Sequence, residues 1–265
     1  MRPDAPRKKG VARLAEIMGR DMWNFFRAGF LAFLGCLPFI IGMFFAVETH
    51  ALLFMLLAGI IGGLIAGPEL SAMADTVLRS LRDEPGYWWE TYRRVWKRNA
   101  RESLVPGMLT GLVLSMQIFT LFHMSVISAG IVTWVLLILS FVVTLGLESY
   151  IWPQIALLDL PLYGILKNSL LLFLGYLPRS LGAIAIKAVY WGAILLFFPL
   201  TTIILPFTNF WLPMLPALLC IYQPLNKCFT IESTINKMRE DELNAALAKD
   251  NEPCLLYTSP SPRDA

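Results

Sequence analysis

The sequence predicts an all-α fold: a polytopic membrane helical bundle with about six transmembrane helices and cytoplasmic amphipathic helices. Hydrophobic residues make up 57% of the 265 residues and charged residues only 15%. Soluble globular domains have roughly 45–50% and about 25%. The mean hydropathy is +0.61, and the apolar residues gather in runs of about 20, the length that a helix needs to cross a bilayer. A soluble protein of this composition would lack the polar residues to cover its surface.

Six apolar runs are the predicted spans. They cover residues 25–47, 51–67, 104–122, 126–152, 181–207 and 210–225. The second run is short and rich in glycine, and the sixth is interrupted by Pro213 and Pro216. A further apolar segment, 153–178, contains Asp159 and is divided by Pro161. We expect this segment to be interfacial or re-entrant rather than a seventh span.

Connections that contain lysine or arginine alternate with connections that contain neither, and this alternation predicts the orientation. They occur in the N-terminal arm 1–24, in the connection 68–103, after the fourth span, and in the tail 226–252, whereas the three other connections have none. Cytoplasmic loops carry the excess of these cations. We therefore expect a multi-pass protein of the plasma membrane with both termini cytoplasmic, a basic amphipathic arm at the start and a cytoplasmic helix in the tail. The last residues, 253–265, resemble a translated sequencing adapter, and we expect them to be non-native.

Glycines in two neighbouring spans predict close helix packing. Gly59, Gly63 and Gly67 share one face of the second span, and Gly107 and Gly111 repeat the spacing in the third. In lipid, helices associate through small residues that let their backbones approach. The spacing leaves open whether the contact forms within one chain or by self-association of two chains.

The stretch "GYWWETYRRVWKR", residues 86–98, combines aromatic and basic residues. On a helix after Pro85 and Gly86, the two kinds fall on opposite sides. The aromatic side holds Trp88, Trp89, Tyr92 and Trp96, and the basic side holds Arg93, Arg94, Lys97, Arg98 and Arg101. Glu90 with Arg94, and Arg98 with Glu102, have the spacing of helical ion pairs.

This separation favours a membrane surface over nucleic acid. Base stacking needs exposed aromatic rings beside the cations that hold phosphates, and the formal net charge is only +3. A helix at the headgroup level instead places its rings in the interface and its cations toward anionic lipid. We expect contact with the lipid bilayer, no nucleic acid, and leave open a protein partner at the same surface.

The sequence has no signature of catalysis. It lacks a GxxxxGK[ST] phosphate loop and the HExxH and GxSxG motifs. We therefore expect no enzyme, no cofactor and no metal. The two histidines, His50 and His123, accompany Glu48 near the predicted outer edge. A metal site there is conceivable, but loop histidines without motif spacing are expected to be solvated.

Three polar residues lie inside predicted spans: Gln117, Glu148 and Lys187. Polar groups at membrane depth are candidates for function. Lys187 either extends to the cytoplasmic edge or pairs with Glu148, and the three together are candidates for lining a polar path.

Four segments resemble the YesL-like family of bacterial integral membrane proteins, a domain family of unknown function. They are "MGRDMWNFFRAGFLAFLGCLPF", "GPELSAMADTVLRSL", "YWWETYRRVWKRN" and "LKNSLLLFLGYLP", within residues 15–240. The resemblance implies an accessory role in carbohydrate uptake or utilisation, with ABC-type transporter components as candidate partners. It implies no catalytic residues. The alternative is a small-solute transporter or permease subunit.

Overall fold

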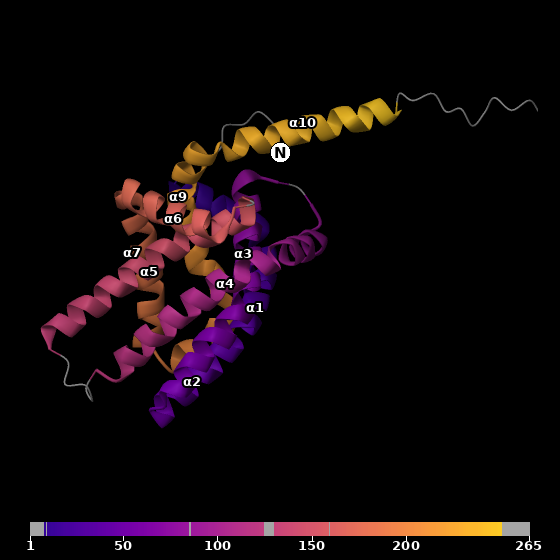
Figure 1. Cartoon of the computed structure of the whole chain (residues 1–265). Helices are drawn as coiled ribbons and strands as arrows, with labels where there is room; N and C mark the ends of the chain where they lie inside the picture. The colour runs from indigo at the N-terminus through magenta and orange to yellow at the C-terminus, as the bar shows by residue number, and fades with distance from the viewer. Residues whose placement is uncertain (1–7, 9, 85, 125–129, 159, 251–265) are drawn as a thin grey trace, which may run out of the picture. The chain divides into compact units, whose positions relative to one another are not determined.

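The computed structural model of this chain describes residues 8, 10–84, 86–124, 130–158 and 160–250, and the regular elements in these residues are all helices (Figure 1). The prediction of an all-α fold is confirmed. The chain divides into two compact units, Met1–Pro224 and Leu225–Ala265. The predicted non-native residues 253–265 lie outside the described part of the chain.

The first unit begins with long helices and continues with shorter ones. The elements are α1 (Gly10–Thr49), α2 (Leu52–Leu57), the π-helical turn η1 (Ala58–Gly62), α3 (Gly63–Arg82), α4 (Trp88–Phe122), α5 (Ile131–Leu157), α6 (Leu162–Gly175), α7 (Leu177–Leu196), η2 (Leu200–Thr202), α8 (Leu205–Thr208) and α9 (Trp211–Phe229), whose last turn enters the second unit. The remainder of the second unit holds α10 (Ile231–Asp250).

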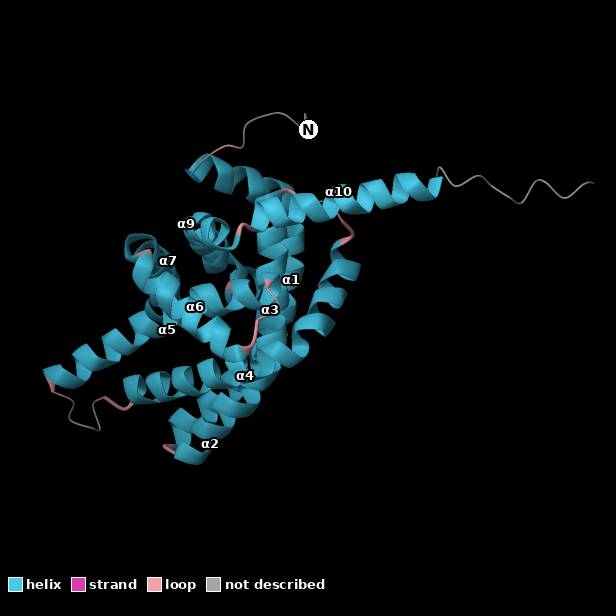
Figure 2. Ribbon diagram, turned by 45° about the horizontal axis from the view of Figure 1, so that its top comes forward, coloured by secondary structure: helices cyan, strands magenta, loops and turns pink. Residues whose placement is uncertain are grey.

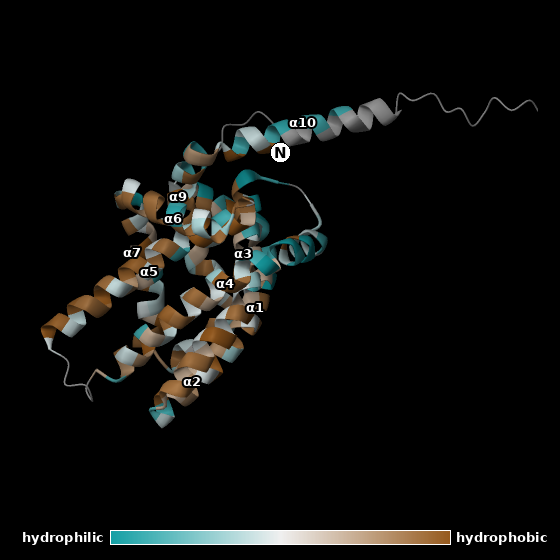
Figure 3. Ribbon diagram, in the orientation of Figure 1, coloured by the Kyte–Doolittle hydropathy of each residue, from teal (hydrophilic) through white to brown (hydrophobic). Residues whose placement is uncertain are grey.

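Six helical stretches are long and apolar enough to cross a membrane, which confirms the predicted number of spans. They are Gly10–Thr49, Leu52–Arg82, Trp88–Phe122, Ile131–Leu157, Leu177–Leu196 and Leu205–Phe229. Figure 3 shows the hydrophobic colour along α1, α2 and α5. Large apolar side chains such as Val132 and Leu136 on α5 are exposed. Exposed apolar surface on this scale requires an apolar surrounding, and the lipid bilayer supplies it.

Three spans are parts of longer helices than the sequence predicts. The N-terminal arm continues into the first span as the 40-residue α1, and α3 carries the second span onward to Arg82. The basic-aromatic stretch and the third span form the single 35-residue α4. A 40-residue helix is about 60 Å long, twice the roughly 30 Å of a hydrocarbon core. These helices therefore extend beyond the bilayer instead of stopping at its edge.

The helix α4 bends between its two ends (Figure 2). Pro106 lies near its middle, where the proline ring removes one backbone hydrogen bond and crowds the preceding turn. The bend lets the basic-aromatic part take a direction different from that of the span.

The segment 153–178 does not form one element. Its first residues, 153–157, belong to α5, and α6 begins only after Pro161. The 14 residues of α6 reach about 21 Å, less than a full span. Its packing partner is mainly α5, and Leu170, Leu171 and Leu174 are exposed on it. An interfacial or re-entrant position of α6 stays a prediction.

The helices α3 and α4 make the most extensive contact of any pair, and the five predicted glycines lie in it or beside it. A Cβ atom added to Gly111 would lie 2.8 Å from the Cα of Gly63, and one added to Gly67 would lie 3.3 Å from the Cα of Gly107. Gly59 faces the backbone of α4 in the same way. These contacts therefore form within one chain. They are this close because glycine has no side chain to hold the two backbones apart.

Candidate functional site

The carboxylate of Glu69 joins α3 to the aromatic side of α4. The Tyr92 hydroxyl donates to Glu69 Oε2 at 2.5 Å, and the Trp96 indole Nε1 donates to Oε1 at 2.9 Å. The Tyr92 residue is only 4% exposed. The expectation that this ring lies in the lipid interface is therefore wrong, because the ring packs on protein. Glu69 was not singled out in the sequence, since nothing in its spacing marks a partner 23 residues away.

The other aromatic residues of this stretch differ in exposure. Trp88 contacts Tyr92, with ring centroids 5.2 Å apart, and the guanidinium of Arg27 lies 5.7 Å from the centre of the Trp88 ring. Trp89 is 56% exposed. Of the four predicted aromatic contacts, Trp89 is thus the one most open to lipid or to a partner.

Four cations of α4 form what we call the basic face. Arg93, Arg94, Lys97 and Arg101 are exposed, and none of them has an ion pair within 4.0 Å with the residues that the structure describes. The predicted pair of Glu90 with Arg94 does not form. The basic face is therefore available to bind an external anionic group.

Arg98 is the exception among the predicted cations. Its Nη2 donates to the Ala156 carbonyl oxygen at 2.7 Å, and its Nε donates to Asn99 Oδ1 at 3.0 Å. Ala156 lies in the last turn of α5, where carbonyl groups lack helical partners and favour a nearby cation. Arg98 therefore ties α4 to α5, and its predicted pair with Glu102 is replaced by this contact.

Asp83 fixes the end of α3 to the first turns of α1. Arg13 Nη2 lies 2.6 Å from Asp83 Oδ2, and Arg20 bonds the other carboxylate oxygen. Asp83 has a φ of 59° at the helix C-cap, a left-handed conformation that aspartate tolerates. Burial acts to raise the pKa of Asp83, but the hydrogen bonds from Arg20 and Arg13 outweigh it and hold that pKa below its usual value.

Further hydrogen bonds from Arg13 and Arg20 hold the end of α3, which precedes the basic face, against α1. Arg13 Nη2 also donates to the Leu81 carbonyl at 3.1 Å, and Arg20 Nη2 donates to the Ser80 carbonyl at 2.8 Å. Two cations of the predicted basic arm are thus bound to α3. The connection between α3 and α4 is held by α1 on one side and by Glu69 on the other.

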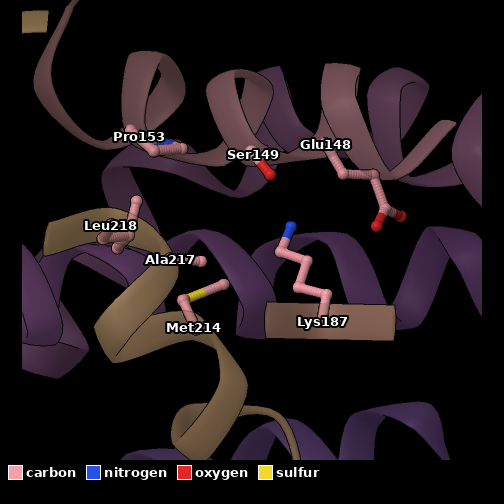
Figure 4. A pocket seen from close by; sticks show the side chains of 7 residues that line it. All are labelled: Glu148, Ser149, Pro153, Lys187, Met214, Ala217 and Leu218. Atoms are coloured by element: carbon pink, nitrogen blue, oxygen red, sulfur yellow. The ribbon is translucent and has the colours of Figure 1, made fainter. Parts of the chain in front are cut away.

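Glu148 and Lys187 face a common pocket between α5, α7 and α9 (Figure 4). The pocket is small, with room for about one water molecule. Its lining also includes Ser149, Pro153, Met214, Ala217 and Leu218. Lys187 is 8% exposed and points into the pocket. It therefore does not extend to the membrane edge, which leaves the alternative of an interaction with Glu148.

Glu148 and Lys187 face the same pocket without direct contact, because no ion pair within 4.0 Å joins them among the described residues. Ionisable groups at membrane depth are costly and are kept where they serve a function. The pocket is accordingly the strongest candidate for a site inside the bundle.

Gln117, on α4, is hydrogen-bonded to two residues of α5. Its Nε2 donates to Ser140 Oγ at 2.5 Å and to Thr144 Oγ1 at 2.8 Å. Residues 140, 144 and 148 follow each other at intervals of four on one helix face. The Gln117 Oε1 atom is buried and has no hydrogen-bond partner in the part of the chain that the structure describes. Gln117 of α4 therefore bonds to the face of α5 that also carries Glu148.

The two histidines are paired with each other, and only His50 is exposed, so the expectation of solvated histidines is wrong for His123. His50 Nδ1 lies 2.7 Å from His123 Nε2, and His123 is only 6% exposed. Within the described residues, no group of three or more His, Cys, Asp or Glu side chains is placed to hold a metal ion.

Comparison of the chain with protein-family models, with curated proteins and with solved structures gives no match. The geometry of the basic face and of the pocket is therefore what bears on function.

Proposed function

We propose that this chain is a non-enzymatic accessory subunit of the plasma membrane that binds a partner through its basic face. The positive-inside rule supports a cytoplasmic position for this face and for both termini. The resemblance to the YesL-like family supports a carbohydrate uptake or utilisation system as the setting, with an ABC-type transporter component as the partner. The observation that carries the proposal is the set of four exposed cations on a firmly held helix.

The support of the basic face matters because it reduces the cost of binding. A surface that is ordered before association loses less conformational freedom when the complex forms. The Glu69 contacts and the Asp83 contacts hold the two helices around this face. Anionic lipid headgroups also attract such a surface, by about 1 kcal/mol per cation, so the test must separate a protein partner from lipid.

Affinity purification from native membranes tests the partner. The variant Arg94→Glu with Lys97→Glu reverses two charges of the basic face, and the control Arg94→Lys with Lys97→Arg keeps them. We expect a transporter component to co-purify with the wild type and with the control, and to be lost with the reversal. An unchanged set of co-purifying proteins in the reversal variant would mean that the face contacts only lipid.

The pocket of Glu148 and Lys187 favours a second candidate function, that of a small-solute transporter or permease subunit. A buried amine that points into a pocket beside a carboxylate offers both a donor and an acceptor to a passing solute. Purified protein in liposomes should then take up labelled sugars, and Lys187→Met should abolish the uptake. The control is Lys167→Met on α6, where the lysine is exposed. Liposomes that take up no solute would remove this candidate and leave the accessory role intact.

A further inference from the structure

The histidine pair joins two spans at the end of the bundle opposite the basic face. His50 directly follows α1, and His123 directly follows α4. The N-terminal parts of these helices lie by Asp83 and the basic face, so their C-terminal ends lie at the far end. The two rings meet edge to face, with centroids 4.8 Å apart and an interplanar angle of 81°.

The position of each hydrogen follows from the partners. His123 Nδ1 lies 2.7 Å from the Phe119 carbonyl oxygen, which can only accept, so His123 Nδ1 carries a hydrogen. A neutral imidazole has one N–H group, which leaves His123 Nε2 bare. His50 Nδ1 must therefore donate to His123 Nε2. The Phe119 ring stacks on His123 at 4.0 Å between centroids and fixes the orientation of the acceptor.

We propose that His50 and His123 form a proton-sensitive latch that opens when the pair takes up two protons from the aqueous phase at this end of the bundle. The first proton binds His50 Nε2, a position that the bond to His123 does not use. The hydrogen bond then has a charged donor and is strengthened. The second proton has only His123 Nε2 left to bind. Both facing atoms then carry hydrogens, two positive rings face each other, and the bond is lost.

Few ionisable residues surround the histidine pair at this end of the bundle. His50 is exposed and so is in contact with water. Glu48, on α1, is the one carboxylate beside it in the sequence, and it is also exposed. The packed neighbours α2, the span part of α4 (residues 104–122) and the part of α5 that precedes Glu148 contain no Asp, Glu, His, Lys or Arg. Among these elements, Glu48 is therefore the one ionisable group that shares this end with the pair.

The latch holds a strained turn beside an apolar cluster. His50 has a φ of 53°, a left-handed conformation that persists when neighbouring contacts hold it. Met43 and Ala46 of α1 pack on Met55 of α2 and on Phe119 of α4 in the adjacent cluster. Opening of the latch removes the polar link between α1 and α4 and loosens this cluster. The inference does not depend on the function proposed above.

Nuclear magnetic resonance tests the arrangement of hydrogens. The chain has only two histidines, so protein labelled with ring-¹⁵N histidine in lipid nanodiscs gives two sets of imidazole signals. At neutral pH we expect His123 to carry its hydrogen on Nδ1 and to have a bare Nε2 that is coupled to the His50 Nδ1–H. A hydrogen on His123 Nε2 at neutral pH would overturn the latch.

Hydrogen exchange tests the opening. When the pH falls from 7.5 to about 4, well below the range in which an ordinary histidine gains its charge, we expect backbone exchange at residues 43–57 to rise about fivefold after correction for intrinsic rates, as the loss of one hydrogen bond predicts. His123→Phe should show the faster exchange at both pH values, whereas the matched control Glu48→Gln should behave like the wild type. Equal corrected rates at the two pH values in the wild type would refute the latch even if the His123 variant does not fold.

Discussion

Substitution of Gly63 by alanine tests the contact that organises the bundle. The added methyl group would meet the Gly107 carbonyl group, with the carbonyl carbon at 3.0 Å, and the Cα of Met108 at 3.1 Å. These neighbours are backbone atoms, so no side chain can rotate away to make room. A side chain at Gly107 would likewise clash with α3, because a Cβ atom there would lie 2.9 Å from the Cα of Gly67.

The expected cost follows from the separation that the methyl group requires. The nearest atom to the added methyl group is the Gly107 carbonyl oxygen, which lies closer than the two carbons. Carbon and oxygen atoms of neighbouring backbones normally lie about 3.3–3.6 Å apart, so α3 and α4 must separate by about 1 Å locally. A gap of this size forfeits up to about half of the dispersion energy of the affected contacts, and overpacking of a filled interior costs about 1–3 kcal/mol. We expect Gly63→Ala to lower the free energy of unfolding by about 2 kcal/mol, roughly a thirtyfold change in the equilibrium constant.

The assay is reversible unfolding of the purified protein in mixed micelles by a denaturing detergent, followed by tryptophan fluorescence. The matched control is Gly192→Ala on α7, where an added Cβ atom has no neighbour within 4 Å. Removal of a flexible residue there should leave stability unchanged or raise it by about 0.4–1 kcal/mol. If Gly63→Ala is as stable as Gly192→Ala, the backbones of α3 and α4 are not in the contact described, and the reasoning fails.

Three further predictions concern the polar contacts around the basic face and use the same unfolding assay. Tyr92→Phe should cost about 1.5–3 kcal/mol, because it removes a hydrogen bond to the charged Glu69. The pKa of Asp83 is lower in the folded protein than in the unfolded chain, so the ion pairs of Asp83 stabilise the fold fully above the unfolded value of about 3.9 and lose this effect as the pH falls through the folded value. Arg98→Ala should cost about 1.5–3 kcal/mol, because the Ala156 carbonyl loses a charged donor.

Each of these predictions has a control on the same surface. Trp89→Phe, at an exposed ring outside the Glu69 contact, should have an effect within about 0.5 kcal/mol, and so should Arg101→Ala. Asp83→Asn should remove part of the loss of stability below about pH 4. Equal effects of Arg98→Ala and Arg101→Ala would contradict the link to α5, and an acid profile unchanged by Asp83→Asn would contradict the ion pairs of Asp83.

The spans were predictable because their signal is local. A run of apolar residues reports the surroundings of a helix without reference to any other part of the chain, and the six spans match the structure in number. Their ends were less predictable. The sequence suggests a stop near Gly67 and a start near Leu104, but α3 and α4 continue past these points, since a helix of good formers that packs on a neighbour does not end where the lipid ends.

The glycine spacing also indicated a contact before the structure showed its partners. Small residues at intervals of four are useful only where another backbone comes close, so Gly63 and Gly107 pointed to helix packing. The choice between one chain and two was open, because the spacing is the same in both cases. Only the tertiary structure places these glycines against each other within one chain.

The polar contacts were beyond the sequence for a different reason. The basic-aromatic stretch showed which residues share a side of α4. It did not show that Tyr92 donates a hydrogen bond to Glu69 or that Arg98 donates one to the Ala156 carbonyl. Each of these bonds joins residues that are distant in the chain, so no regular spacing of residues in the sequence indicates it.

By itself, the sequence determined that this chain is a helical membrane protein with about six spans, that its cations gather in alternate connections, and that α4 has an aromatic side and a basic side. These properties depend on composition and on the helical repeat, which act over a few residues. The tertiary structure decided that Lys187 faces Glu148 in a pocket, that His50 meets His123, and that Asp83 holds Arg13 and Arg20. Such pairings depend on how the helices pack, because only packing brings side chains from separate helices within reach of one another.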